Sequence, residues 1–377
     1  MCSDQLAAPA LITRSAALQG LVERLAQEKI LAVDTESNSL YAYQEQVCLI
    51  QFSTPEEDFL VDPLTLEDLS PLGALLADPG IEKVFHAAEY DLITLKRDFG
   101  FTFENLFDTM VAARILGWEE VGLGAMLKAE FGVQLDKRFQ RANWGQRPMT
   151  PEMLSYARLD THYLIPLRKR MKAELQAENR WALAVEDFQR LRQVNGRAPD
   201  ELPDSCWRIS GSYDLSGQDA AVLQELCRYR DQVARTINRP LFKVFGDQTL
   251  LTLATVSPTG MKELRKSTIL NPRQLQRHGE ALVRSVRRGL KAEPISPPRS
   301  LRPDEQYLAI LDSLKSWRKT TGQRMGVNSD IILPRDLLYT LAAHKPGSRE
   351  AVAEIMKDVP WRLERFGEAI YTLLAKD

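Results

Sequence analysis

Residues 30–37 read Ile-Leu-Ala-Val-Asp-Thr-Glu-Ser, a short apolar run that ends in two acids. The run Leu31–Val33 predicts a buried strand. Because side chains alternate along a strand, Asp34 and Glu36 should project from the same face of a sheet. Buried carboxylates need a partner, and divalent metal ions are natural partners for them. Asp-x-Glu alone is a weak signal in a chain with 51 acids, so the surrounding sequence has to decide.

Further strand and helix signals alternate around this run. Strands are predicted at 47–53, 58–61 and 83–85, and helices at 66–76, 89–98 and 110–116. Another helix should open with Thr150 at its N-cap and Pro151 in its first turn, and should continue past Pro166 after a kink. Strands mixed with helices in this way predict an α/β domain with a central sheet.

Two more segments carry candidate functional residues. In Phe-His-Ala-Ala-Glu-Tyr-Asp-Leu, His86 ends a strand and Asp91 falls on the first turn of the next helix. In Tyr-Ala-Arg-Leu-Asp, Tyr156 and Asp160 are four residues apart and share one helical face. Each also has an ordinary interpretation: a structural histidine, a helix-start acid, and a buried tyrosine near a surface acid.

Composition excludes several classes of protein. No run of about 18 apolar residues and no secretion signal is present, so neither a membrane span nor export is expected. The four cysteines form no Cys-x-x-Cys pair, which argues against a zinc ribbon or a disulfide framework and for a reducing cytoplasm. The net charge of −2 gives no support to nucleic-acid binding. Residues 261–291, however, hold nine Lys and Arg against two Glu, which could face phosphates.

The second half of the chain is helical and repeats itself. A shift of 88 positions aligns Leu226 with Leu314 and Arg230 with Arg318, and it continues along the chain without a gap. Two copies of one helical domain, each with its own core, are therefore predicted. Residues 195–218 are rich in Gly, Pro, Ser and Asp and predict a linker before the first copy.

Together the motifs resemble the DEDD 3′–5′ exonuclease superfamily and, more closely, its ribonuclease D family. The resemblance covers roughly residues 25–175 and includes Val-Asp-Thr-Glu, Cys-Leu-Ile-Gln, Phe-His-Ala-Ala-Glu-Tyr-Asp-Leu, Leu-Asp-Lys, and Tyr-Ala-Arg-Leu-Asp. A tyrosine stands four residues before Asp160, and Ser155 occupies the position five before it, as in the tyrosine subclass. Ser37 and Asn38 depart from the Phe-x-Arg continuation of some members, which leaves open the shape of the pocket for the 3′-terminal nucleotide.

The resemblance implies a ribonuclease H-like α/β domain with a central mixed sheet, followed by two HRDC domains, the helical modules shared with RecQ-type helicases. The expected boundaries are 1–195 for the exonuclease, 196–216 for a linker, 217–294 for the first HRDC domain, 295–302 for a second linker and 303–377 for the second HRDC domain.

By the same resemblance, four acids hold two divalent ions (Mg²⁺ or Mn²⁺), and Tyr156 positions the attacking water. These acids are Asp34, Glu36, Asp91 and Asp160. The implied activity is a cytoplasmic 3′–5′ exoribonuclease that releases 5′-mononucleotides from RNA with a free 3′ end, including tRNA precursors, without an obligate protein partner. RNA contacts are expected from His86 and from six arginines of the first repeat, which are Arg230, Arg235, Arg277, Arg284, Arg287 and Arg288.

Two alternatives stay open at this stage. The first is a DNA 3′-exonuclease used in repair, because the same residues serve DNA polymerases; the lack of a polymerase-sized region argues against proofreading within the chain. The second is a catalytically silent nucleic-acid-binding scaffold, against which the presence of all four acids and the tyrosine argues.

Overall fold

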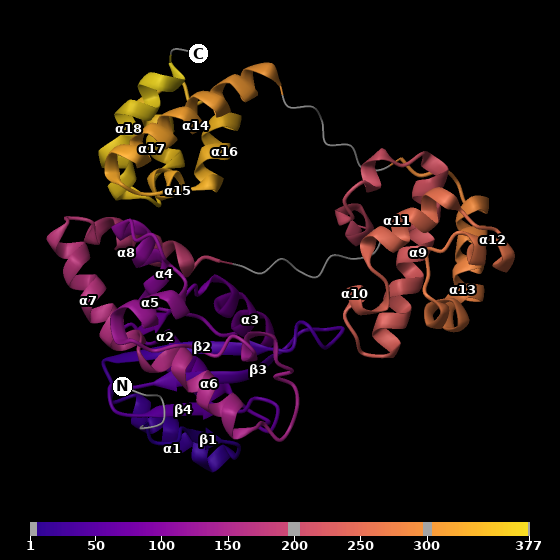
Figure 1. Cartoon of the computed structure of the whole chain (residues 1–377). Helices are drawn as coiled ribbons and strands as arrows, with labels where there is room; N and C mark the ends of the chain where they lie inside the picture. The colour runs from indigo at the N-terminus through magenta and orange to yellow at the C-terminus, as the bar shows by residue number, and fades with distance from the viewer. Residues whose placement is uncertain (1–5, 195–203, 297–303, 376–377) are drawn as a thin grey trace. The chain divides into compact units, whose positions relative to one another are not determined.

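The computed structural model describes residues 6–194, 204–296 and 304–375. The chain divides into two compact units (Figure 1). Unit 1 comprises Met1–Ser37, Val47–Gly196 and Pro303–Asp377, and unit 2 comprises Asn38–Gln46 and Arg197–Arg302. Most of the linker expected at 295–302, and the first part of the one expected at 196–216, lie outside the described residues.

Unit 1 is built on a six-stranded mixed sheet in the order β1-β4-β3-β2-β5-β6. The strands are β1 (Ala10–Ile12), β2 (Ile30–Ser37), β3 (Val47–Ser53), β4 (Asp58–Val61), β5 (Glu82–Phe85) and β6 (Leu106–Asp108). β3 runs antiparallel to β2 and β4, whereas the other three pairs are parallel. The predicted α/β fold with a central mixed sheet is confirmed.

The strand that carries the first two acids is longer than the apolar run predicted. β2 continues to Ser37 because its polar half pairs with the fully buried strand β3, Asp34 opposite Gln51 and Glu36 opposite Leu49. The register shifts between Glu36 and Ser37, where the regular pairing ends. The two acids therefore lie within the sheet and not in a loop after it.

Helices cover both faces of this sheet (Figure 1). On one face α1 (Ser15–Leu25), α2 (Ser70–Ala77) and α3 (Glu89–Phe99) share a core with Val33 and Ile50. On the other face, α4 (Thr109–Leu116), α7 (Leu164–Ala177) and α8 (Trp181–Leu191) pack on Ala32, Val84 and Phe107. On that same face α6 (Pro151–His162) contacts β2, β3 and β4. The short helix α5 (Leu123–Phe131) follows α4 in the chain.

One predicted helix is in fact two. α6 ends at His162 and α7 starts at Leu164, so that Pro166 lies in the first turn of α7. Proline is well tolerated there because the first turn of a helix needs no N–H donors. The expected kink at Pro166 is therefore replaced by a break just before it.

The helical repeat is confirmed. Unit 2 contains α9 (Gly217–Thr236), α10 (Leu241–Val244), α11 (Asp247–Val256), α12 (Met261–Lys266) and α13 (Pro272–Lys291). Unit 1 contains α14 (Glu305–Met325), α15 (Ser329–Ile332), α16 (Arg335–His344), α17 (Arg349–Ile355) and α18 (Pro360–Leu374). Each helix of the second set starts 88 residues after its counterpart, and each set has its own apolar core.

Part of the expected first linker belongs to the core of unit 2. The 3₁₀ turn Asp204–Arg208 places buried Cys206 next to Cys227 of α9, with their Cα atoms 6.2 Å apart. No spacing pattern predicts this proximity, because tertiary packing brings the two positions together. Among the described helices, none combines the length and the apolar character needed to cross a membrane.

Candidate active site

Three elements bring the four predicted acids to one region of unit 1. Asp34 and Glu36 share the face of β2 that α6 covers, and Asp160 near the end of α6 approaches that face. Asp91 lies on the first turn of α3, which packs on the opposite face. Asp91 and Asp160 are buried, whereas Asp34 and Glu36 are partly exposed to a cavity. The sequence separates these acids by more than a hundred residues, and the fold brings them together.

Thr35 links the two faces of the sheet. It lies between the two acids of β2 and, by alternation, points toward α3, where its hydroxyl donates a hydrogen bond to the carboxylate of Asp91. The position of Asp91 relative to β2 is therefore set by a direct contact from the same strand that carries Asp34 and Glu36.

Asp108 fixes the turn that leads into α3. Its carboxylate accepts hydrogen bonds from the backbone N–H groups of Ala87 (3.2 Å) and Ala88 (2.7 Å), and it also caps α4. Ala87 adopts φ = 60°, a left-handed conformation that is unfavourable for alanine, so these bonds help to hold it. His86 Nδ1 lies 2.9 Å from the hydroxyl of the adjacent Thr109. One aspartate thus positions both His86 and the start of the helix that carries Asp91.

α6 is anchored to the sheet by polar contacts near its C-terminal end. The hydroxyl of Thr161 lies 2.7 Å from that of Ser53 on β3, and His162 Nδ1 lies 2.9 Å from Asp58 on β4. At its N-terminus the hydroxyl of Thr150 accepts a hydrogen bond from a backbone N–H of the first turn, as the sequence predicts. The helix that carries Tyr156 and Asp160 therefore has a fixed position on the sheet.

Tyr156 is held by aromatic neighbours and faces the acids. Its ring centre lies 5.7 Å from that of Phe139 and 6.1 Å from that of Trp144, and its side chain is buried. Burial and then the nearby negative charges of Asp160 and Glu36 raise the pKa of its phenol well above the usual value. The phenol therefore keeps its proton at neutral pH and can donate a hydrogen bond.

Burial and mutual repulsion raise the pKa of every acid in the cluster. For Asp34, burial is the largest cause and the charges of Asp91, Asp160 and Glu36 add to it. Burial likewise raises the pKa of Glu36 and of Asp160, with neighbouring carboxylates contributing. The pKa of Asp91 rises to about 7 through burial, although the hydrogen bond from Thr35 opposes the rise. The cluster is thus an excess of negative charge, and among the described residues none of the four carboxylates forms an ion pair.

The donor set suits divalent metal ions. Carboxylate oxygens are the preferred ligands of Mg²⁺ and Mn²⁺, and a bound cation would remove the repulsion that raises these pKa values. The buried amide of Gln51, which pairs opposite Asp34 on β3, has no hydrogen-bond partner among the described residues and adds a polar group beside the cluster. Within that part of the chain, no three His, Cys, Asp or Glu side chains are already arranged around a common metal position. The residues therefore fit the metal in chemistry, and their side chains would have to adjust on binding.

A cavity of about 1210 Å³ opens onto the cluster. Its lining includes Asp34, Glu36, His86, Tyr156 and Asp160. Two lysines, Lys128 of α5 and Lys137, also line it and supply positive charge near the acids. The cavity has the size and mixed charge expected of a site for one or two nucleotides.

One of the arginines expected to contact RNA is instead structural. Arg230 is only 5% exposed, and it donates hydrogen bonds to the carbonyl of Phe245 and to Asp247. Its counterpart Arg318 donates in the same way to the carbonyl of Leu333. The predicted RNA contact of Arg230 is therefore corrected: this arginine braces α9 against the turn after α10.

The other five arginines that were expected to contact RNA are exposed. Arg235 contacts Asp231 and Tyr43, Arg287 donates to the carbonyl of Thr259, and Arg288 pairs with Glu225. A cavity of about 490 Å³ between α9 and α13 is lined by Tyr229, His278 and three of these arginines, which are Arg277, Arg284 and Arg288. Three of the predicted contacts thus share one groove.

Sequence reasoning missed Thr35, Gln51 and Asp108. A helix-start signal was available for Asp108, because an aspartate followed by a helical segment is a typical N-cap. Thr35 and Gln51 gave no local signal, since their importance depends on strand pairing and on the position of α3.

Comparison with known proteins agrees with this geometry. Residues 9–176 match the family described as 3′–5′ exonuclease, and residues 219–286 and 307–374 each match the HRDC domain. Ribonuclease D of Pseudomonas paraeruginosa is 30% identical over 351 residues, which cover 91% of this chain and 92% of that protein. The chain belongs to the ribonuclease D family. Members of this family are 3′–5′ exoribonucleases, and the chain is accordingly a hydrolase of this class.

Two further relatives extend the comparison. The crystal structure of Escherichia coli RNase D, described as an exoribonuclease involved in structured RNA processing, matches with a TM-score of 0.71 and 27% identity, covering 98% of this chain and 99% of that one. Protein RRP6-like 3 of Arabidopsis thaliana is 34% identical over 271 residues, or 66% of this chain. The match spans only 30% of the length of that plant protein. Ribonuclease D of Pseudomonas paraeruginosa and of Nitrobacter hamburgensis, in contrast, are matched over 92% and 94% of their length.

Proposed function

We propose that the chain removes nucleotides one at a time from the 3′ end of RNA, as 5′-mononucleotides, in the cavity lined by β2, α5 and α6. The observation that carries this proposal is the cluster Asp34, Glu36, Asp91 and Asp160. Burial and neighbouring carboxylates raise the pKa of each of these acids, and none forms an ion pair within the described residues. Such an excess of carboxylates beside an open cavity is expected of a site that binds cations and phosphate together.

The four acids would hold two divalent ions, Mg²⁺ or Mn²⁺. When bound, such ions lower the pKa of a water molecule and neutralise charge on the departing oxygen. Thr35 and Asp108 keep Asp91 in place for this purpose, one from the neighbouring strand and the other through the turn 86–88. Lys128 and Lys137 would attract the phosphates of the strand that enters.

Tyr156 would orient the attacking water and not deprotonate it. Its raised pKa keeps the phenol protonated, and the neighbouring rings of Phe139 and Trp144 restrict its orientation. Tyr156→Phe should therefore lower the rate of cleavage by roughly 10²- to 10³-fold, as removal of a positioned hydrogen-bond donor does at other sites. The affinity of the Tyr156→Phe variant for Mn²⁺, measured by calorimetry, should equal that of the natural protein. A matching loss of metal affinity would instead make the tyrosine part of the metal site.

RNA with a free 3′ end is the proposed substrate, and tRNA precursors are the first to test, because the Escherichia coli relative is described as acting on structured RNA. The chain is proposed to act in the cytoplasm and to need no obligate protein partner. The exposed arginines Arg235, Arg277, Arg284, Arg287 and Arg288, together with His86, remain the proposed RNA contacts.

The decisive experiment follows a 3′-extended tRNA and a DNA strand of matched sequence. We expect Mg²⁺-dependent release of 5′-mononucleotides from the RNA, abolished by chelation of the metal and restored on its return. A clear preference for the DNA strand would favour the repair nuclease instead. Absence of both cleavage and divalent-metal binding would leave the silent scaffold as the better description.

A further inference from the structure

The two HRDC modules have corresponding residues throughout. Their helices start 88 residues apart, and the two matched segments, 219–286 and 307–374, are offset by the same number. The internal brace also repeats, because Arg230 and Arg318 donate to carbonyls at equivalent positions. Each residue of one module therefore has a defined counterpart in the other.

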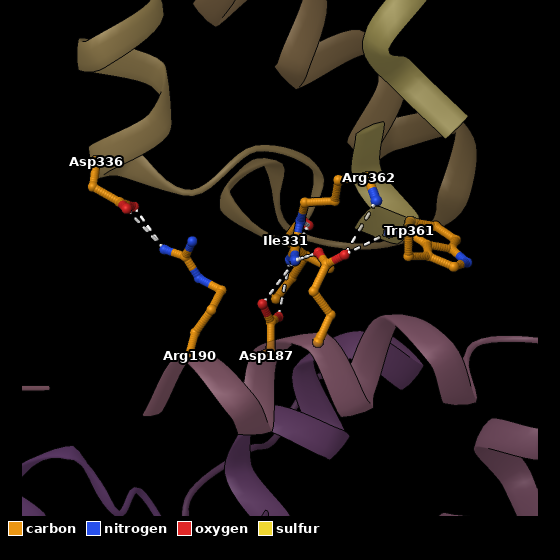
Figure 2. Close-up of polar contacts among 7 residues, drawn as sticks. Asp187, Arg190, Ile331, Asp336, Trp361 and Arg362 are labelled. Atoms are coloured by element: carbon orange, nitrogen blue, oxygen red, sulfur yellow. Dashed lines mark hydrogen bonds and ion pairs between the residues drawn. The ribbon is translucent and has the colours of Figure 1, made fainter. Parts of the chain in front are cut away.

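The second module uses one of its faces to hold the exonuclease domain. Arg362, at the start of α18, is fully buried and pairs with Glu186 and Asp187 of α8 (Figure 2). The carboxylate of Glu186 also accepts hydrogen bonds from the backbone N–H groups of Trp361 (2.7 Å) and Arg362 (3.3 Å). This junction lies within unit 1 and buries the pair Arg362 and Glu186, with Asp187 partly exposed beside it.

Further contacts surround the buried pair. Asp336 pairs with Arg190 of α8 at 2.9 Å, as Figure 2 shows, and Asp330 pairs with Arg114 of α4. Ile331 joins the apolar core beneath α4 and α7. We call the surface that makes these contacts the docking face of the second module. It consists of Met325, Val327, Asp330, Ile331, Asp336, Trp361 and Arg362.

The first module has different chemistry at the same positions. The counterparts are Ile237, Arg239, Phe242, Lys243, Gln248, Arg273 and Gln274. The docking face carries two acids and one base, for a charge of −1, whereas the counterparts carry three bases and no acid, for a charge of +3. An aromatic ring stands in place of one of the acids. The counterpart set therefore lacks the groups that pair with Arg114 and Arg190 in the second module.

This counterpart surface is exposed within unit 2. The side chain of Phe242 is 54% exposed and that of Ile237 is 38% exposed. Arg239, Lys243 and Arg273 are also exposed, and none forms an ion pair in the part of the chain that the structure describes. The ammonium group of Lys243 lies 5.6 Å from the ring centre of Phe242, a cation–π contact that leaves the outer face of the surface basic. Ile237 also lines the cavity between α9 and α13, so the surface continues into the groove that contains Arg277 and Arg284.

We infer that this surface binds a single-stranded segment of the RNA substrate. We call it the open face and define it by Ile237, Arg239, Phe242, Lys243 and Arg273. Three bases without an acid complement the phosphate backbone, and an exposed aromatic ring beside them can stack on a base whatever its identity. The inference deepens the proposed function and rests on it. One repeat thus uses this face to hold the enzyme together, and the other uses it to hold the substrate.

The test compares two triple variants of the full-length chain. One reverses the charges of the open face (Arg239→Glu, Lys243→Glu and Arg273→Glu). The matched control makes the same charge change at three exposed lysines of the second module that lie outside its docking face (Lys315→Glu, Lys319→Glu and Lys357→Glu). Binding of a fluorescent single-stranded RNA of about 12 nucleotides is measured in chelator between 50 and 200 mM salt. Phosphate contacts show a strong salt dependence over roughly this range of salt concentration.

The open-face variant should bind RNA at least about tenfold more weakly, and its slope of log affinity against log salt should fall by about 2, at roughly 0.7 per lost phosphate contact. The control should stay within about threefold of the natural protein. Phe242→Ala alone should weaken binding about fivefold without changing the slope, since it removes stacking and no charge. Unchanged binding in the open-face variant, or equal losses in both triple variants, would overturn the inference.

Cleavage of a trinucleotide separates this inference from the proposed function. Such a substrate is too short to need a second binding surface, so the open-face variant should cleave it at the rate of the natural protein. If the natural protein does not cleave it or any longer RNA, the proposed function fails. If cleavage is normal and RNA binding by the open-face variant is also normal, only the inference fails. Should the triple variant melt at a lower temperature than the natural protein, the Phe242→Ala result decides.

Discussion

Unit 1 contains two clusters of buried charge that are balanced in opposite ways. At the junction, the guanidinium of Arg362 lies against Glu186 and Asp187, so the charges are compensated within the chain. At the active site, Asp34 and Asp160 repel neighbouring acids, and neither forms an ion pair within the described residues. Paired charges can be buried in a stable fold, whereas unpaired ones are costly unless something outside the chain binds them. The difference separates a structural cluster from a functional one.

The largest effect should come from the unpaired cluster. Asp34→Asn should reduce mononucleotide release on the order of a thousandfold or more, because a ligand of the proposed metal site is lost. The same change should raise the melting temperature in chelator, since it removes one of several repelling carboxylates. Asp312→Asn, at an exposed acid far along the chain, is the control. If Asp34→Asn kept full activity, the proposed site would be wrong.

Arg362→Met should have the opposite profile. It leaves the buried carboxylate of Glu186 without its cationic partner and should lower the free energy of unfolding by about 3–5 kcal/mol, measured by urea denaturation. Trinucleotide cleavage per folded molecule should be unchanged. The double variant Arg362→Met with Glu186→Met should recover part of the loss, because it removes one of the two acids left unpaired. Arg349→Met, which breaks the exposed pair with Glu368, should have no measurable effect.

The third effect is a dependence on pH. The folded pKa of Asp91 is about 7, well above the value of roughly 3.9 for an unfolded aspartate. Between these two values the folded state holds more protons than the unfolded state, so stability in chelator falls as pH rises from about 4 to 7 and then levels off. The free energy of unfolding of Asp91→Asn, relative to that of the natural protein, should therefore rise as pH increases from about 4 to 7. A difference that does not change with pH would contradict the raised pKa.

Local patterns predicted most of the fold. Alternation and apolar runs identified the strands that flank Asp34, and a constant offset identified both helical modules, because these signals are contained within short stretches of chain. The acids of the site were found because their residue types and spacing are chemically distinctive. Thr35 was not, since its role depends on which helix lies behind its strand.

Contacts between distant segments could not be predicted. Glu186 looks like any exposed acid of a helix, and its partner Arg362 lies more than a hundred residues away. Arg230 looked like a phosphate contact because its charge was visible in the sequence, but its burial and its acceptors were not. The proximity of Cys206 to Cys227 depends in the same way on a turn that packs into a core. In each case tertiary packing decides the role of a residue whose local sequence is uninformative.

The constant spacing of the two modules has an evolutionary consequence. Since no residue has been inserted or lost between corresponding helices, the copies have diverged through side chains alone. A duplicated module whose backbone is already stable can change the residues of one surface without having to solve its fold again. Duplication within this chain would thus have supplied a second copy of the surface on which selection could act. The other copy could continue to bind the catalytic domain.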